Sequence, residues 1–232
     1  MASCWCSHPR PGYWPRSGGR TWRIFPTSRP RNTIEGSHAR LSPARLTVTY
    51  LQAHLLIATP DLAEPFTRSV VLLVRHNEEG ALGLILNHRT SAQLEEAWNK
   101  LSDTPCHRQA PIYLGGPCEG PLVALHTQEF LLEIEVMQGL YFSAEKDKLE
   151  TLAAQTDDPG ASVKFFAGYS GWAAGQLENE IARGSWSVMP AKPEHVFWHE
   201  DELWKRATRF VADAAWRSTL GIKHVPPDLR VN

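Results

Sequence analysis

The segment with the clearest potential for chemistry is 168–172, Gly-Tyr-Ser-Gly-Trp. It follows an apolar run, 163–167, that is typical of a strand, and it precedes a stretch with helical spacing. A serine between glycines at a strand-to-helix turn is the arrangement of a hydrolase nucleophile elbow, and Asp213 and His224 follow it in the required order. That turn needs a small residue two positions after the serine, where this chain has Trp172. We therefore predict no catalytic residue, and a hydrolase remains an alternative.

The glycines of the same segment favour a second alternative, an anion bound by backbone N–H groups at the start of a helix. Neither phosphate fingerprint is met, because the segment lacks both a Gly-Lys-Ser/Thr ending and a G-x-G-x-x-G spacing. We favour a structural role, in which Gly168 and Gly171 let the helix pack closely on the sheet. No cofactor is predicted.

A polar stripe on the predicted helix is the preferred binding surface. Trp172, Gln176, Asn179 and Arg183 follow one another at spacings of four, three and four, so they share one helical face. A tryptophan at the head of such a stripe is either covered by the fold, which is the more frequent case, or offered to a partner. Glu178 and Glu180, on the same helix, are interpreted as solvated carboxylates rather than a catalytic pair.

Strand ends and turns supply the remaining candidates. His76 and His88 could ligate a metal, but their spacing has no ligand signature, so we expect hydrogen bonds in loops and no metal. The Gly115-Gly116-Pro117 segment is interpreted first as a turn. The residues predicted to contact a ligand or partner are Asn87, Gly115, Gly116, Gly168, Tyr169, Gly171, Trp172, Gln176, Asn179 and Arg183.

The elements that must position these residues alternate irregularly. Short apolar runs predict strands over 55–58, 69–74, 81–86, 112–114, 122–125, 131–136, 163–167 and 186–188. Helical spacing predicts helices over 91–101, 143–154, 172–183 and 200–215, the second one capped by Ser143. The runs 69–74 and 81–86 flank a turn ending in Gly80 and form a hairpin apolar on both faces. Without a regular βαβ order, the fold class is α+β.

Charge divides the 232-residue chain into two parts. Residues 1–45 carry eight arginines, no lysine and one acid, whereas residues 46–232 have a net charge of −8. We expect 1–45 to be either a disordered extension or upstream sequence translated from a start codon assigned too early, and 46–232 to be the single domain. An acidic domain binds duplex DNA poorly, so direct DNA binding is an alternative that we do not favour.

The remaining composition excludes two further classes. The longest apolar run, 69–74, is far shorter than the ~20 residues of a membrane helix, so no membrane association is predicted. The four cysteines, Cys4, Cys6, Cys106 and Cys118, lack the spacing of a metal site and are expected to be free thiols in a reducing cytosol.

Three segments resemble one known family. They are 55–60 followed by 68–71 and 76–87; Leu114-Gly115-Gly116-Pro117; and Phe166 to Trp172 followed by Gly175-Gln176-Leu177-Glu178 and Trp186. In this order and spacing they resemble the AlgH/YqgE-like proteins over about residues 48–221. The resemblance implies a small bacterial cytosolic protein whose mixed sheet, flanked by helices, curls toward a small barrel. Some such proteins are described as transcriptional regulators through alginate control, and the resemblance implies no reaction.

The function we predict is therefore that of a non-enzymatic cytoplasmic regulatory or adaptor protein. It would act through an unknown protein partner or small ligand. A hydrolase or anion-binding enzyme that uses the 168–172 loop, and a direct DNA-binding regulator, are the alternatives.

Overall fold

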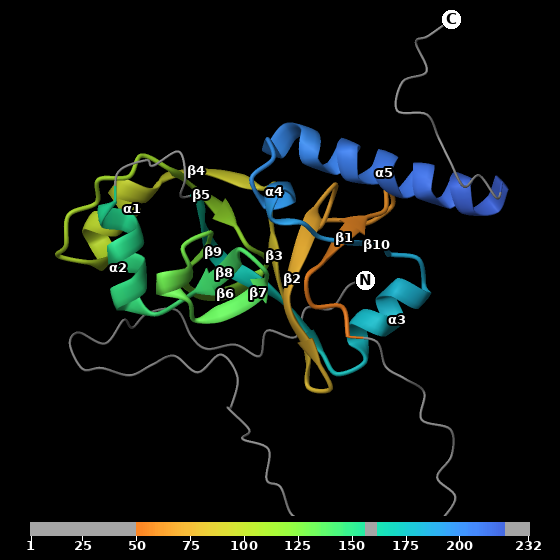
Figure 1. Cartoon of the computed structure of the whole chain (residues 1–232), viewed down its shortest axis with the longest axis horizontal. Coiled ribbons are helices and arrows are strands. Elements are labelled where there is room, and N and C mark those ends of the chain that lie inside the picture. Colours follow the sequence, from red (N-terminus) through yellow and green to blue (C-terminus); the bar gives the residue numbers. More distant parts are fainter. Residues whose placement is uncertain (1–49, 156–161, 221–232) are drawn as a thin grey trace, which may run out of the picture.

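The fold is built on one ten-stranded sheet (Figure 1). The computed structural model describes residues 50–155 and 162–220; the predicted N-terminal extension lies outside them. The main path of pairing runs β10-β1-β2-β3-β9-β6-β8-β7, with β5 pairing β9 and β4 pairing β5. The strands are β1 (His54–Ala58), β2 (Val70–Asn77), β3 (Gly80–Ile85), β4 (Arg89–Gln93), β5 (Pro111–Leu114), β6 (Cys118–His126), β7 (Ile134–Met137), β8 (Leu140–Ser143), β9 (Val163–Ala173) and β10 (Trp186–Pro190).

The α+β class is confirmed, and the sheet is mixed and flanked by helices as predicted. The β5–β9 pair is parallel, whereas the other pairs in the described sheet are antiparallel. The predicted hairpin is also confirmed, because β2 and β3 pair up to Asn77 and Gly80, and Gly80 has a φ of 136°. The path of strands ends at β10 and β7 without closing, so the expected curl does not produce a barrel.

Strand β9 corrects the prediction of a strand-to-helix junction at 168–172. The strand does not end at Ala167 but continues to Ala173, pairing with β3 through contacts such as Ser170 with Gly83. The helix begins only at Gln176, after Gly175 with a φ of 73°. The prediction was wrong because the free edge of β3 extends the ladder, a long-range effect that local glycine content does not reveal.

The helices are α1 (Leu94–Leu101), α2 (Lys146–Ala154), α3 (Gln176–Ala182), α4 (Pro193–Val196) and α5 (Glu200–Leu220), with a short 3-10 helix η1 (Glu129–Leu131). The cap predicted at Ser143 is wrong. Ser143 ends β8, and its hydroxyl donates to the Leu131 carbonyl at 3.0 Å. Strands β4 and β8 and helix α4 had no counterpart in the prediction.

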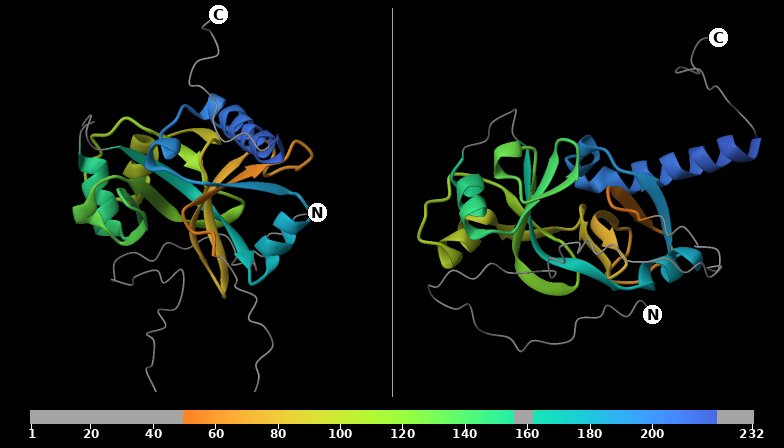
Figure 2. Two further views of the ribbon diagram at one scale, coloured as in Figure 1. Left: turned by 45° about the vertical axis from the view of Figure 1, so that its right-hand side comes forward. Right: turned by 60° about the horizontal axis from the view of Figure 1, so that its bottom comes forward.

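The apolar core of the described residues consists of three clusters, which lie beneath different helices. Trp98 of α1 and Leu152 of α2 pack with Phe165, whereas Leu177 of α3 packs with Trp172 and Trp186. Leu203 and Ala207 of α5 belong to a third cluster, which contains Phe142 and Phe166. Figures 1 and 2 show α1 and α2 together at one end and α5 lying apart from them. None of the helices among residues 50–155 and 162–220 has the length and apolar character needed to span a membrane.

Candidate functional site

A buried lysine lies where helix α5 meets the sheet. Lys164 of β9 donates from Nζ to the Leu86 carbonyl at 3.2 Å, and the same atom lies 4.3 Å from the centre of the Tyr113 ring. Burial lowers the pKa of Lys164 to about 8, because a charged amine is poorly solvated there; the nearby Glu200 carboxylate raises it in part. No sequence motif pointed to Lys164; the available signal was a charged residue inside the apolar run 163–167.

Glu200, the first residue of α5, completes this anchor cluster of Arg89, Tyr113, Lys164 and Glu200. The Tyr113 hydroxyl donates to Glu200 Oε2 at 3.4 Å, and Arg89 Nη1 lies 3.5 Å from Oε1. Burial, reinforced by the Glu200 charge, raises the pKa of Tyr113 to about 12. Burial acts to raise the pKa of Glu200, but its backbone hydrogen bond and the charge of Lys164 lower it overall. The cluster fixes the start of α5 on β4, β5 and β9.

The first half of α5 lies firmly against the sheet. Leu203 and Ala207 are buried, and Trp204 donates from its indole nitrogen to the Ala58 carbonyl at 2.9 Å. The guanidinium of Arg68 lies 5.8 Å from the centre of the Trp204 ring. Together with the anchor cluster, these contacts set the direction of the whole helix.

The second half of α5 projects beyond the sheet (Figures 1 and 2). Leu203, Ala207, Phe210 and Ala214 follow at spacings of four, three and four, so they share one helical face. Leu203 and Ala207 are covered, but Phe210 is 56% exposed and Ala214 is exposed. We call Phe210 and Ala214 the outer stripe. Val211, which follows Phe210, still packs against the core, so Phe210 lies at the edge of the covered side of α5 and Ala214 lies beyond it.

The glycine candidates lie where β9 crosses the 115–118 segment. Gly168 has a φ of 70°, and a Cβ there would lie 2.6 Å from the Cys118 carbonyl oxygen. A Cβ on Gly116 would meet the Ser170 hydroxyl. These two glycines therefore permit close approach of two backbones. Tyr169 is half-buried, and its ring lies beside Gly171 and Gly120.

Ser170 lacks the setting of a nucleophile. It is 0% exposed, and its hydroxyl donates to the Gly115 carbonyl at 3.1 Å. His224, which follows Ser170 in the chain order that the hydrolase alternative requires, lies outside the described residues.

The predicted polar stripe is not a single helical face. Trp172 belongs to β9 and is buried, stacked with Phe66. The fold therefore covers this tryptophan, which is the more frequent of the two cases named above. Its indole nitrogen and that of Trp186 both donate to Glu180 Oε2 at 2.9 Å. Gln176 donates to Glu180 Oε1 at 3.0 Å. Interpreting Glu180 as a solvated carboxylate was therefore wrong: it receives three side-chain hydrogen bonds.

The other candidates make local contacts. Asn87 accepts from the Val70 N–H at 2.8 Å and donates to the Arg68 carbonyl at 2.9 Å, which joins two strand ends. Asn179 and Arg183 are exposed on α3, and Asn179 donates to the Gly175 carbonyl at 2.8 Å. Whether any of these residues contacts a partner remains a prediction.

His76 is held by the fold on both ring nitrogens. Its Nδ1 accepts from the Leu51 N–H at 2.9 Å, and its Nε2 lies 3.0 Å from Glu178 Oε1. Among the described residues, no group of three or more His, Cys, Asp or Glu side chains is placed to hold a metal ion.

The comparisons with known proteins agree with the resemblance. The model of the AlgH-like family matches residues 55–215. The chain belongs to the AlgH-like family. It is 38% identical over 160 residues to a UPF0301 protein of Chlorobaculum tepidum, covering 67% of this chain and 83% of that protein. It is 33% identical over 183 residues to one of Idiomarina loihiensis, covering 75% and 98%.

Two solved structures share the fold. The solution structure of the AlgH protein from Pseudomonas aeruginosa matches with a TM-score of 0.58 and 31% identity, over 82% of this chain and 100% of that one. A crystal structure of a Corynebacterium diphtheriae protein matches with a TM-score of 0.56 and 24% identity, over 74% and 89%, which shows the fold alone.

Proposed function

We propose that this AlgH-like chain is a non-enzymatic cytoplasmic regulatory or adaptor protein that binds a protein partner through the outer half of α5. The observation that carries the proposal is the outer stripe: Phe210 continues the face on which Leu203 and Ala207 are buried, yet is itself 56% exposed. An exposed apolar face on a helix that is fixed at one end is a common contact surface for a protein partner. The partner can receive such a helix in an apolar groove.

The setting of Ser170 supports a non-enzymatic role over a hydrolase. A nucleophile must reach substrate and must be paired with a base. The Ser170 hydroxyl is covered and is engaged by a backbone carbonyl. A fluorophosphonate probe should therefore leave the folded chain unlabelled. Labelling that disappears in Ser170→Ala would support the hydrolase instead.

Regulation would follow from binding rather than from contact with duplex DNA. Residues 46–232 have a net charge of −8, and phosphate contacts need positive charge. We propose that any effect on transcription passes through the protein partner. A gel shift whose affinity falls steeply with salt would favour direct DNA binding instead.

The exposed side of α3 is a second proposed contact region, with Asn179 and Arg183 as its residues. Arginine is over-represented among residues that dominate binding energy. Arg183→Ala should leave stability unchanged, because the side chain is exposed. Reduced partner capture by this variant would assign α3 to the interface, and unchanged capture would remove it.

The direct test is affinity capture from bacterial cytosol with quantitative mass spectrometry. The bait is the full chain in three forms: unchanged, Phe210→Ser and Trp216→Ser. Trp216 is 65% exposed on the same helix but lies two residues after Ala214, away from the outer stripe, so it is a matched control. The proposal expects partners that Phe210→Ser loses and Trp216→Ser retains. Equal capture by all three forms would contradict it.

A further inference from the structure

Arg68 has an uncommon backbone conformation next to the first turns of α5. Its φ is 52°, a left-handed value that residues other than glycine rarely adopt, so the contacts around it must hold it there. Asn87 donates from Nδ2 to the Arg68 carbonyl at 2.9 Å and accepts from the Val70 N–H at 2.8 Å. Beside it, His88 Nε2 lies 3.3 Å from the Thr67 carbonyl oxygen. The backbone of Arg68 is thereby fixed against the segment that joins β3 to β4.

The side chain of Arg68 is held by an aromatic ring rather than by a carboxylate. Its guanidinium carbon lies over the Trp204 ring, 5.8 Å from the ring centre. Trp204 is itself fixed, because its indole nitrogen donates to the Ala58 carbonyl at 2.9 Å. Within residues 50–155 and 162–220, no carboxylate lies at ion-pair distance from the Arg68 guanidinium. Arg68 is exposed, so the N–H groups in the plane of its guanidinium are available to a ligand.

Arg89 brings a second guanidinium to the same corner of the molecule. Its side chain is 51% exposed, and its Nη1 lies 3.5 Å from Glu200 Oε1. Glu200 and Trp204 are four residues apart on α5, so Arg68 and Arg89 contact neighbouring positions of one helical face. We call Arg68 and Arg89 the arginine pair.

Positive charge exceeds negative charge among the side chains that meet here. The arginine pair and Lys164 supply three cations, and Glu200 supplies one carboxylate, which gives these four side chains a net charge of +2 at neutral pH. That carboxylate also accepts from the Tyr113 hydroxyl and is only 15% exposed. Residues 46–232 as a whole have a net charge of −8. The corner therefore attracts an anion that most of the domain repels.

The geometry of Arg68 matches one class of anion. Carboxylate and phosphate groups present two oxygens side by side, and a guanidinium edge binds both with parallel hydrogen bonds. The stacked ring fixes the direction of this edge, which lowers the cost of ordering the side chain when a ligand binds. Glu200 shows that a carboxylate is accommodated on Arg89, whereas Arg68 has no such partner in the part of the chain that the structure describes.

We propose that the arginine pair binds an oxyanion, a phosphate or carboxylate group of a ligand, with Arg68 as the bidentate contact and Arg89 as a second charge. Asn87 and Trp204 are positioning residues, since they hold the backbone and the side chain of Arg68. The inference goes beyond the proposed function, because it concerns a surface other than the outer stripe and a different class of ligand. Either one can fail without the other.

The test is an NMR titration of the full chain with inorganic phosphate and, separately, with succinate. Ionic strength is held constant with sodium chloride, so that screening does not change during the titration. The proposal expects saturable shifts of the backbone amide signals of residues 67–70 and 87–89 with at least one of the two ions. The ion that binds more tightly identifies the ligand group as phosphate or carboxylate. The absence of saturable shifts with both ions overturns the proposal.

Four variants decide whether the arginine pair is responsible. Arg68→Ala should weaken binding at least roughly tenfold, because a bidentate contact between charged groups is lost. Arg89→Ala should weaken it less, since Glu200 already engages that guanidinium. Arg68→Lys keeps the charge but not the planar edge, so it should bind more weakly than the unchanged chain and more tightly than Arg68→Ala. Arg183→Ala is the matched control, because it removes an exposed arginine from α3, which lies away from the first turns of α5 in Figures 1 and 2.

The control and a urea melt of each variant keep the result interpretable. The proposal expects Arg183→Ala to bind as the unchanged chain does, and all four variants to unfold at similar urea concentrations. An equal loss of binding in Arg183→Ala would show attraction by overall charge alone and overturns the proposal, as does undiminished binding by Arg68→Ala. If Arg68→Ala proves unfolded, Arg68→Lys decides instead: full affinity in that variant overturns the bidentate contact.

Discussion

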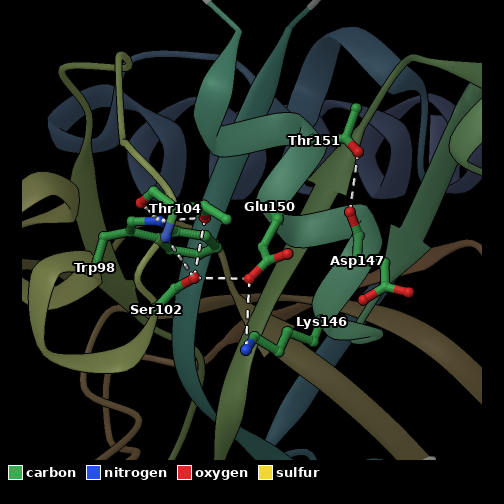
Figure 3. Close-up of polar contacts among 7 residues, drawn as sticks. All are labelled: Trp98, Ser102, Thr104, Lys146, Asp147, Glu150 and Thr151. Atoms are coloured by element: carbon green, nitrogen blue, oxygen red, sulfur yellow. Dashed lines mark hydrogen bonds and ion pairs between the residues drawn. The ribbon is translucent and has the colours of Figure 1, made fainter.

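At the α1–α2 end of the sheet, the apolar faces of both helices are covered except at Leu101, which is 37% exposed, and their polar ends are joined. Figure 3 shows this junction, where the Ser102 hydroxyl donates to Glu150 Oε1 at 2.6 Å and Lys146 lies 3.5 Å from the same oxygen. The Trp98 indole donates to the Thr104 carbonyl at 3.0 Å. In the other region, α5 is anchored at its first residue, but Phe210, at the edge of its covered side, is 56% exposed. The first region is completed by its own chain, whereas the second one has a face available to a partner.

The largest expected difference in the free energy of unfolding is between two substitutions by alanine, one at Trp98 and one at Phe210. Trp98→Ala should reduce the free energy of unfolding by about 3–5 kcal/mol, because Trp98 is only 3% exposed and its removal leaves a cavity. Phe210→Ala should change it by no more than about 0.5 kcal/mol, as expected for a surface residue. Urea melts of both variants check this. Similar losses for the two would remove the contrast between the regions.

The anchor cluster at the start of α5 should make the free energy of unfolding depend on pH in the alkaline range. The pKa of Lys164 is lowered to about 8 in the folded chain, from an ordinary value of 10.5, so between these values the unfolded state binds more protons. Stability should therefore rise from pH 8 toward pH 10, by up to about 3 kcal/mol. Lys164→Met should lack this rise. Urea melts at several pH values measure it, and identical profiles for the two chains would refute the assignment.

In the α1–α2 region, the free energy of unfolding should instead depend on pH on the acid side. Burial lowers the pKa of His126 to about 4, its Gln128 backbone contact opposing this and the Lys148 charge adding to it. Between pH 6.5 and 4 the unfolded state binds the additional proton, so stability should fall as pH falls through this window. His126→Gln should flatten the acid limb while leaving the alkaline rise of Lys164 in place. An unchanged acid limb would show that His126 does not titrate this way.

A smaller effect is expected at the polar junction in Figure 3. Ser102→Ala removes the hydrogen bond to Glu150 and should cost about 1–2 kcal/mol, since the acceptor is charged. Glu150→Gln keeps the shape and should cost less. Thermal melts suffice, and a larger loss for Glu150→Gln would mean that Glu150 stabilises the fold through its ion pair with Lys146 within α2 rather than through the Ser102 hydroxyl at the end of α1.

The sequence predicted the parts of this molecule whose pattern is local. Apolar runs and a turn glycine placed β2 and β3, and helical spacing placed Leu203 and Ala207 on the buried side of α5. The strand continuation through Ser170 was missed because it depends on the free edge of β3, 87 positions earlier at Gly83. The hydrogen bonds of Glu180 were missed although Trp172 and Trp186 lie only eight and six residues away along the chain. The helical spacing of α3 does not show that β9 and β10 bring both indoles to the same carboxylate.

The candidate site was only partly accessible to sequence reasoning. The spacing on α5 predicts one buried stripe of Leu203, Ala207, Phe210, Val211 and Ala214. This prediction is wrong for Phe210 and Ala214, which are exposed, because the spacing does not show where the sheet ends beneath the helix. The anchor cluster joins residues from β4, β5, β9 and α5, whose proximity arises from the parallel pairing of β5 with β9. Such long-range pairings are not encoded in the spacing of any one segment.

The most direct test of the account measures stability and binding on the same preparation of Phe210→Ser. If the outer stripe is a free binding surface, the urea melt should match that of the unchanged chain within about 0.5 kcal/mol. Capture of partners from cytosol should nevertheless be lost, with Trp216→Ser retaining both properties. A Phe210→Ser chain that is clearly destabilised and still captures the same partners would contradict the account, because the stripe would then be covered by the chain itself.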